Sequence, residues 1–351
     1  MNEFLTTLTA IAASAFSPST AALAIAAIGL NIHFGYTGLL NMGQAGFMLV
    51  GAYAFAISIV AGIPLFPAVL IALVAAAVFA LILGVPTLKL RGDYLAIVTI
   101  SAAEIVRMIG RSSLLTDITG GSNGLTGQSY RGPFTDLSFL GDGQTTLGPF
   151  TYDNTGSNGW WIRLVAWSIV GILCLFVFLL MRSPWGRVLR GIREDEDAIR
   201  SLGKNVYSYK MQALILGGTI GALGGIIYVL PASVQADSMG RSMTFFVWTA
   251  LLLGGAATVF GPVLGSIIFF ALRLFVQGIA GQFVPDSIMN GQQAEQFSWI
   301  LIGVVLMLVV IFRPQGVLGN KKEPELQCQL TSDSPPPRPR PPPPPPRASP
   351  P

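Results

Sequence analysis

Residues 64–86 read PLFPAVLIALVAAAVFALILGVP, and this stretch decides the class of fold. It carries no charged side chain and is long enough to cross a bilayer, which takes about 20 apolar residues in a helix. The lack of charge extends to both sides, because no Asp, Glu, Lys or Arg occurs between Glu3 and Lys89. A segment of that length can cross a membrane more than once, so we expect an all-α polytopic membrane protein.

The composition of the whole chain indicates the same class. Of its 351 residues, 52% are hydrophobic and 11% are charged, whereas an average soluble domain carries about 25% charged residues. A soluble globular enzyme is therefore excluded. The net charge is +4, but the basic residues lie mainly between apolar runs and in the tail, a distribution that sets membrane orientation. Nucleic acid is therefore not an expected partner.

Several apolar runs are candidates to span the bilayer. Breaks within helices are expected around 36–43 and 254–262, so some neighbouring runs are parts of one span. We therefore expect eight or nine transmembrane helices. The runs are 20–36, 39–61, 64–86, 93–111, 160–181, 211–230, 244–260, 262–280 and 297–312.

Basic residues predict which loops face the cytoplasm. Loop 182–210 has seven basic side chains, whereas loop 112–159 has one, Arg131, beside four aspartates. The positive-inside rule puts the first loop in the cytoplasm and the second outside, and the single run between them is consistent with both assignments. The same counting puts the C-terminus in the cytoplasm, and the N-terminus outside if there are nine spans.

The chain divides into a transmembrane domain, residues 1–319, and a Pro-rich cytoplasmic tail, residues 320–351. The tail contains six consecutive prolines at 341–346 and is predicted to be disordered, because such a tract favours extended polyproline II over a packed core. An SH3-type ligand is the alternative for the tail. In loop 112–159, Pro133 and Pro149 are expected to break regular structure.

Motifs for catalysis are missing from the sequence. It has no Walker A pattern, no Ser/His/Asp arrangement and no paired carboxylates, and its two cysteines lack a metal-ligand spacing. The chain is therefore predicted not to be an enzyme, and to hold no cofactor or metal of its own. His33 is the single histidine, and we expect it to form hydrogen bonds inside the helix bundle.

A few polar residues in apolar surroundings are candidates for the solute pathway or for the bundle interior. Glu104 and Arg107 are three residues apart, so on a helix they share a face and can pair. Either they form a structural ion pair or they line the pathway. The other candidates with the same two interpretations are Asn41, Gln44 and Asn123.

Glycines at helical spacing predict close helix packing. Small residues let helix backbones approach closely in lipid. The two GxxxG-type sets are Gly217, Gly221 and Gly225, and Gly261 and Gly265.

Loop 182–210 contains a segment that is typical of a short amphipathic helix. Apolar residues at 188, 189, 192, 198 and 199 alternate with charges, and Gly203 is expected to end the helix. Such a helix either lies solvated at the membrane surface or docks to a partner protein.

Five blocks of this sequence resemble the permease subunits of bacterial branched-chain amino acid ABC importers, of the LivM type. Together they extend over about residues 20–318. The blocks are GYTGLLNMGQAGF at 35–47 with GAY at 51–53, RGDYLAIVT at 91–99 with EIVR at 104–107, TGGSNGL at 119–125, SPWGRVLRGIREDE at 183–196, and Gly254-Gly255 with Gly261-Pro262.

The resemblance implies an ABC importer permease bundle in a bacterial inner membrane. It implies four kinds of partner: a homologous second permease, two cytoplasmic subunits that bind ATP and Mg²⁺, an extracytoplasmic solute-binding protein, and the lipid bilayer. Asp197-Ala198-Ile199 followed by Gly203 looks like a degenerate EAA motif, which makes 182–210 the loop that couples to the ATPase. The expected coupling residues are Arg187, Arg190, Arg193, Glu194, Asp195, Glu196, Asp197, Ala198 and Gly203.

Two other functions remain open at this stage. Related permeases that import urea or short amides share these blocks. A secondary transporter driven by an ion gradient is the alternative from another class, and it requires intramembrane ionisable groups or broken-helix ion sites in matched repeats. We find no convincing internal repeat.

Overall fold

The computed structural model describes residues 12–88, 92–141, 143–147 and 150–283, together with short pieces between 293 and 319. The predicted tail, 320–351, lies outside the described residues, as does most of the run 297–312. The helices and strands are α2 (Pro18–Leu30), η1 (Asn31–Tyr36), α3 (Gln44–Val60), α4 (Leu65–Thr87), α5 (Gly92–Arg111), η2 (Ser113–Leu115), α6 (Thr116–Thr119), α7 (Gly127–Thr135), β1 (Gln144–Leu147), β2 (Phe150–Asp153), α8 (Trp160–Arg182), α9 (Pro184–Glu194), α10 (Glu196–Ser201), α11 (Val206–Val229), η3 (Ala236–Met239), α12 (Arg241–Gly254) and α13 (Gly261–Phe283).

Long apolar helices build the bundle, as the sequence predicts. Four described helical segments are long and apolar enough to cross a membrane, namely Pro18–Tyr36, Leu65–Thr87, Trp160–Arg182 and Val206–Val229. Shorter apolar helices, among them Gln44–Val60 and Arg241–Gly254, end at non-helical segments. The predicted breaks are confirmed, because the chain leaves helical geometry at 37–43 and again at 255–260. The all-α polytopic class is therefore confirmed.

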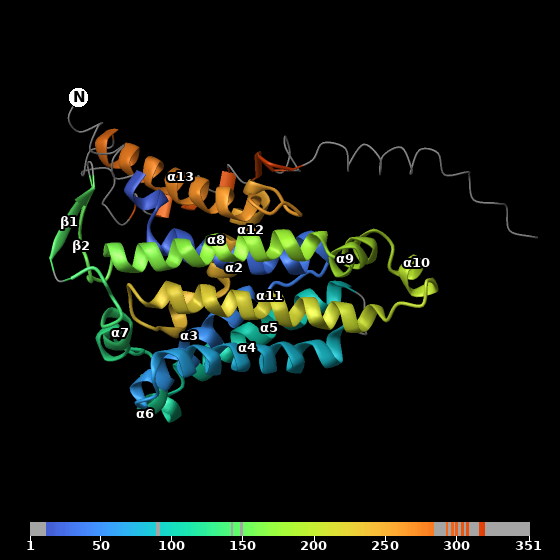
Figure 1. Cartoon of the computed structure of the whole chain (residues 1–351), viewed down its shortest axis with the longest axis horizontal. Coiled ribbons are helices and arrows are strands. Elements are labelled where there is room, and N and C mark those ends of the chain that lie inside the picture. The colour runs from blue at the N-terminus through green and yellow to red at the C-terminus, as the bar shows by residue number, and fades with distance from the viewer. Residues whose placement is uncertain are drawn as a thin grey trace, which may run out of the picture. The chain divides into compact units, whose positions relative to one another are not determined.

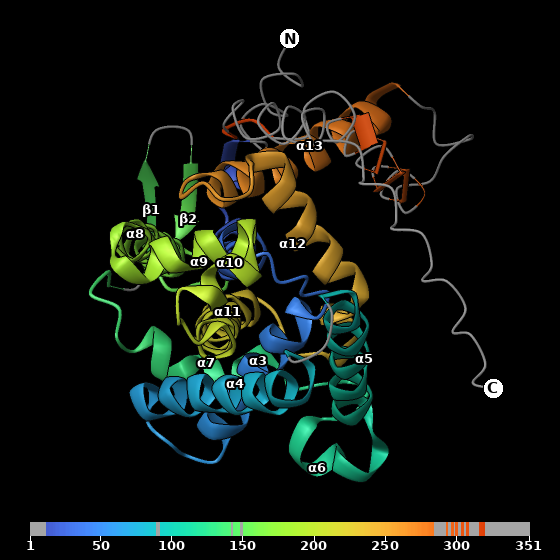
Figure 2. The same cartoon turned by 90° about the vertical axis from the view of Figure 1, so that its right-hand side faces the viewer.

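The helix α11 lies near the middle of the bundle, where it packs against α2, α3 and α4 (Figure 2). The helix α2 begins with Ser17, whose hydroxyl accepts from the Thr20 amide at 3.2 Å, and with Pro18 at the first helical position. Its last turn continues as the π-helix η1. All but one residue of α2 are buried, so this helix lies in the core of the bundle.

Two helices at the periphery present apolar side chains to the surroundings. The helix α4 exposes Phe66, Leu70, Val74 and Ile82, and its buried face is a stripe of alanines at 68, 72, 76 and 80. The helix α8 exposes Leu164, Ile172, Leu175 and Leu179. Exposed apolar faces on long helices are the arrangement that a lipid environment requires.

Residues 112–159 and the pair α9 and α10 lie at opposite ends of α8 (Figure 1). We call the first the hairpin end, because it carries the antiparallel strands β1 and β2, and the second the α9 end. The hairpin is a small departure from an all-helical chain. It is held to α8 by the Trp160 indole, which donates from Nε1 to the Thr145 carbonyl at 2.7 Å.

Loop 112–159 is more regular than the sequence indicates. Pro133 does not break structure, because it lies within α7, which ends two residues later; its missing N–H therefore costs only one bond near the helix end. Pro149 lies outside the described residues.

The Tyr130 hydroxyl donates to the Val229 carbonyl at 2.7 Å, and burial raises the pKa of Tyr130 to about 12, so this donor stays protonated at neutral pH.

The predicted packing glycines lie where helix backbones meet. A side chain at Gly225 would collide with the backbone of Met48 on α3, and one at Gly221 would collide with the Gln44 amide. Gly217 contacts Gly29 and His33 in the same way. Gly261 and Gly265 allow α13 to lie against residues 250–258. In each case the absent Cβ is what permits the contact.

We predict that Gly225→Leu destabilises the fold by about 1–3 kcal/mol or more, because the side chain overpacks the contact between α3 and α11. The matched control is Gly171→Leu on the exposed face of α8, where nothing lies within 4 Å of an added Cβ. Thermal midpoints of the purified proteins in detergent measure the difference. Equal midpoints for the two variants would contradict the assigned packing.

Candidate functional site

A buried polar network surrounds the first helix break. The amide of Asn41 donates to His33 Nδ1 at 3.0 Å and to Gln44 Oε1 at 2.9 Å, and its oxygen accepts from the Gly43 amide at 2.8 Å. His33 Nε2 lies 3.0 Å from the Leu214 carbonyl and therefore donates to it, which leaves Nδ1 as the acceptor. His33 is thus a hydrogen-bonding residue of the bundle interior.

The same network reaches the central helix and α12. Gln44 donates from Nε2 to the carbonyls of Ala26 and Gly217, at 3.2 and 3.4 Å. The Trp248 indole donates to the Asn41 carbonyl at 3.0 Å. Both amides are fully buried. The predicted pair Asn41 and Gln44 therefore lies in the bundle interior, where it ties the break to α2, α11 and α12.

A second amide joins η1, the segment just before the first break, to the second break. Asn31, in η1, donates from Nδ2 to the Thr258 carbonyl at 2.7 Å, and its oxygen accepts from the Ala257 amide at 2.9 Å. Ala257 has a φ of 62°, which is uncommon for a residue with a side chain. Such strained backbone persists where the surroundings hold it, and here Asn31 supplies that support.

At the α9 end, the predicted amphipathic segment forms two helices and not one. Asp195 ends α9 and begins α10, and its Oδ1 accepts from the amides of Asp197 and Ala198 at 2.9 and 3.0 Å. Side chains that cap a helix N-terminus in this way favour a new start over continuation. Leu189 and Ile192 are buried, and Gly203, with a φ of 75°, follows α10 in the left-handed conformation.

The pair α9 and α10 is attached to the bundle by polar contacts. Arg193 donates from Nη1 to the Gly35 carbonyl of η1 at 2.7 Å, and the Arg190 guanidinium lies 5.9 Å from the Tyr36 ring. Trp185 donates to Gln212 at 2.8 Å, and Glu196 pairs with Lys210 of α11. The surface of this pair therefore contacts the broken helix directly. The exposed members of the predicted coupling set are Arg187, Arg190, Arg193, Glu194, Asp195, Asp197, Ala198 and Gly203, and Glu196 is half-buried.

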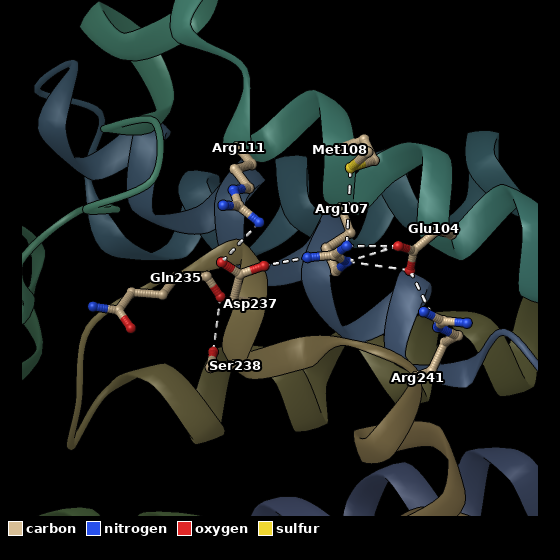
Figure 3. Close-up of polar contacts among 8 residues, drawn as sticks. All are labelled: Glu104, Arg107, Met108, Arg111, Gln235, Asp237, Ser238 and Arg241. Carbon is tan, nitrogen blue, oxygen red and sulfur yellow. Dashed lines mark hydrogen bonds and ion pairs between the residues drawn. The ribbon is translucent and has the colours of Figure 1, made fainter.

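At the hairpin end, five charged side chains from α5, η3 and α12 form a cluster (Figure 3). Arg107 pairs with Glu104, Nη2 to Oε1, at 2.6 Å, so the ion pair expected from their spacing is present. Arg107 also pairs with Asp237 through Nη1. Arg111 lies 3.6 Å from Asp237 and Arg241 lies 3.9 Å from Glu104. We call these five residues the charged cluster.

Asn123 differs from the other predicted polar candidates. Its side chain is exposed near the start of the hairpin end, so the bundle-interior interpretation is wrong for this residue. The reason is that Leu125 pairs with Val234 as an isolated β-bridge, which holds residues 120–125 over the connection between α11 and α12. A role for Asn123 in lining the pathway stays a prediction.

The family model described as the branched-chain amino acid transport system / permease component matches residues 13–310. The chain belongs to this family. It is therefore a membrane permease, a transport subunit with several apolar helices. It is 33% identical over 304 residues to the high-affinity branched-chain amino acid transport system permease protein LivM of Escherichia coli K12, with 84% of this chain and 67% of that protein covered.

Two further relatives carry the same description. The LivM permease of Salmonella typhimurium is 32% identical, with 84% of this chain and 67% of that protein covered. A probable branched-chain amino acid transport permease of Methanocaldococcus jannaschii is 25% identical over 333 residues, with 85% of this chain and 90% of that protein covered. The family identified from the five sequence blocks is thereby confirmed.

Some residues that hold the polar networks of this permease escape prediction from the sequence. Asp237 lies in a short connection, and only the folded chain brings it to Arg107. Trp248 and Asn31 resemble ordinary members of apolar runs, although both hold a helix break. Their one signal is that an amide or indole in an apolar run must find a hydrogen-bond partner.

We predict that Asn41→Leu lowers stability by about 1–3 kcal/mol for each buried group left unsatisfied, because His33, Gln44 and the Gly43 amide each lose a partner. Asn123→Leu is the control, since that side chain is exposed. Chemical or thermal unfolding of purified protein provides the measurement. A midpoint for Asn41→Leu within error of the control would show that the network contributes nothing to stability.

Proposed function

We propose that this chain is the membrane-spanning subunit of an ATP-driven importer that admits branched-chain amino acids to a bacterial cytoplasm. The names of its relatives support this substrate class. The alternative importer of urea or short amides has no such support. The alternative driven by an ion gradient is not favoured either, because the carboxylates of Glu104 and Asp237 are both engaged by arginines.

The contact of Arg193 with η1 carries the mechanistic part of the proposal. Alternating access requires that an event at the ATPase change the conformation of the membrane helices. The bond from Arg193 to the Gly35 carbonyl joins α9 to a π-helix, a segment type that often marks functional positions. ATP-driven movement of α9 then acts on the helix break without passing along a whole span.

The proposed partners follow from the two ends of the bundle. This chain has no Walker A pattern of its own, so two separate ATPase subunits hydrolyse ATP with Mg²⁺. One of them docks on residues 183–204 of this chain. The charged, exposed surface of α9 and α10 suits such a protein contact. A solute-binding protein meets the hairpin end, and a homologous permease completes the complex. In this scheme the α9 end and the C-terminus are cytoplasmic, in agreement with the basic residues of loop 182–210.

Reconstitution tests the substrate class. The chain is purified with its partner permease, ATPases and binding protein, and uptake of radiolabelled leucine into proteoliposomes is measured with and without ATP. We expect uptake that requires ATP and is competed by isoleucine and valine. Uptake driven by a proton or sodium gradient without the ATPases would contradict the proposal.

The coupling contact has its own test. We predict that Arg193→Met reduces leucine transported per ATP hydrolysed about tenfold, the factor that corresponds to 1.4 kcal/mol and thus to the loss of about one charged hydrogen bond. The methionine keeps an apolar stem of similar length. Arg182→Met, at the end of α8, is the control for lost positive charge, because Arg182 is exposed and lies outside the proposed docking segment 183–204. Equal coupling ratios in the two variants would exclude Arg193 as the link.

A further inference from the structure

Two arginines on one face of α5 hold a single carboxylate. Arg107 and Arg111 are four residues apart, which puts them one helical turn apart. Arg107 Nη1 pairs with Oδ1 of Asp237, and Arg111 Nη1 lies 3.6 Å from Oδ2, so each guanidinium faces its own oxygen (Figure 3). This is the geometry by which a protein recognises a carboxylate group, and here an internal carboxylate occupies it.

The surrounding charges favour a second anion. The charged cluster contains three guanidinium groups, Arg107, Arg111 and Arg241, and two carboxylates, Glu104 and Asp237. Three positive charges against two negative charges leave one positive charge in the cluster. The distances of 3.6 Å for Arg111 and 3.9 Å for Arg241 exceed hydrogen-bond length. Both outer arginines therefore retain donors for a further ligand.

Asp237 is suited to exchange. Its side chain is 51% exposed, whereas that of Arg107 is 17% exposed, so water and solutes reach the aspartate more readily than its main partner. It belongs to η3, a helix of only four residues. Exposed ion pairs contribute little to stability, with a median of about 0–1 kcal/mol. Replacement of Asp237 by another carboxylate keeps the charges of both arginines matched.

We propose that Arg107 and Arg111 form a binding site for the carboxylate of a zwitterionic amino acid, and that Asp237 occupies this site until the substrate displaces it. Glu104 then lies beside the bound carboxylate and attracts the ammonium group of the same molecule. Because Asp237 links α5 to the connection before α12, its release removes the ion pairs between that connection and α5. This inference rests on the proposed function for its substrate class.

Binding of leucine to the permease itself tests the site. The complex of permeases and ATPases in lipid nanodiscs, without the binding protein, is titrated with leucine, with leucinamide and with 4-methylpentanoate, and binding is followed by saturation-transfer NMR. Leucinamide lacks the carboxylate and 4-methylpentanoate lacks the ammonium group. We expect leucine to bind more tightly than 4-methylpentanoate, and leucinamide not to bind.

Substitutions separate an exchangeable ligand from a structural contact. Asp237→Asn removes the internal competitor with little change of shape, so leucine affinity is expected to rise at least about fivefold, while Arg111→Gln is expected to abolish binding. Asp136→Asn, which removes an exposed carboxylate from the end of α7, controls for net charge. Unchanged or weaker leucine binding by Asp237→Asn would overturn the proposal, as would binding of leucinamide equal to that of leucine. A lower thermal midpoint of Asp237→Asn without tighter leucine binding would likewise assign the contact to structure alone.

Failure of the proposed function has a different signature. It appears as absent ATP-dependent leucine uptake by the complete wild-type complex with its binding protein. In that event 4-methylpentanoate still probes the arginine pair, and tighter binding of it by Asp237→Asn supports a carboxylate site. If wild-type uptake is normal and neither compound binds better to Asp237→Asn, the site fails and the proposed function stands.

Discussion

A helix that breaks inside a bilayer leaves backbone N–H and C=O groups without partners, and no water is present in the hydrocarbon to satisfy them. This permease has two such breaks, at 37–43 and 255–260, and side chains supply the missing partners. The Asn41 side chain accepts a hydrogen bond from the Gly43 amide, and the Asn41 backbone carbonyl accepts one from the Trp248 indole. The Asn31 side chain accepts from the amide of Ala257 and donates to the carbonyl of Thr258. The position of α12 and the contact of α9 with Gly35 both depend on the side-chain amides of Asn31 and Asn41. These amides hold in place the segments that α12 and α9 contact.

The two ends of the bundle use charge in different ways. At the α9 end, the charged side chains cover α9 and α10 on their exposed faces, while the apolar residues Leu189 and Ile192 attach α9 to the bundle. At the hairpin end, charges from three separate elements converge on one cluster. The first arrangement presents a surface, and the second links elements. The proposed ATPase contact uses the first arrangement, and the proposed amino acid site uses the second.

Much of this structure follows from the sequence, and the reasons are physical. Apolar runs such as 64–86 predict spans because the bilayer fixes their length, and Gly and Asn in apolar surroundings predict the breaks. The spacing of Glu104 and Arg107 predicts their ion pair because helix geometry is local. Asp237 is different, since its pairing with Arg107 depends on how η3 is placed 130 residues later in the chain. The boundary between α9 and α10 does not follow from the sequence, because the apolar stripe continues past Asp195, whereas the cap at Asp195 interrupts the helix.

The glycine contacts of α11 have a consequence for motion. Because Gly217, Gly221 and Gly225 bring this helix into backbone contact with α2 and α3, no lipid chain or loosely packed side chain separates the three helices. Sliding or rotation of α11 against α2 or α3 would drive backbone atoms together. These three helices therefore move as one rigid unit. Movement of α9 in the proposed function therefore enters the bundle through η1 and the break that follows it, and not through sliding of α11 against α2 or α3.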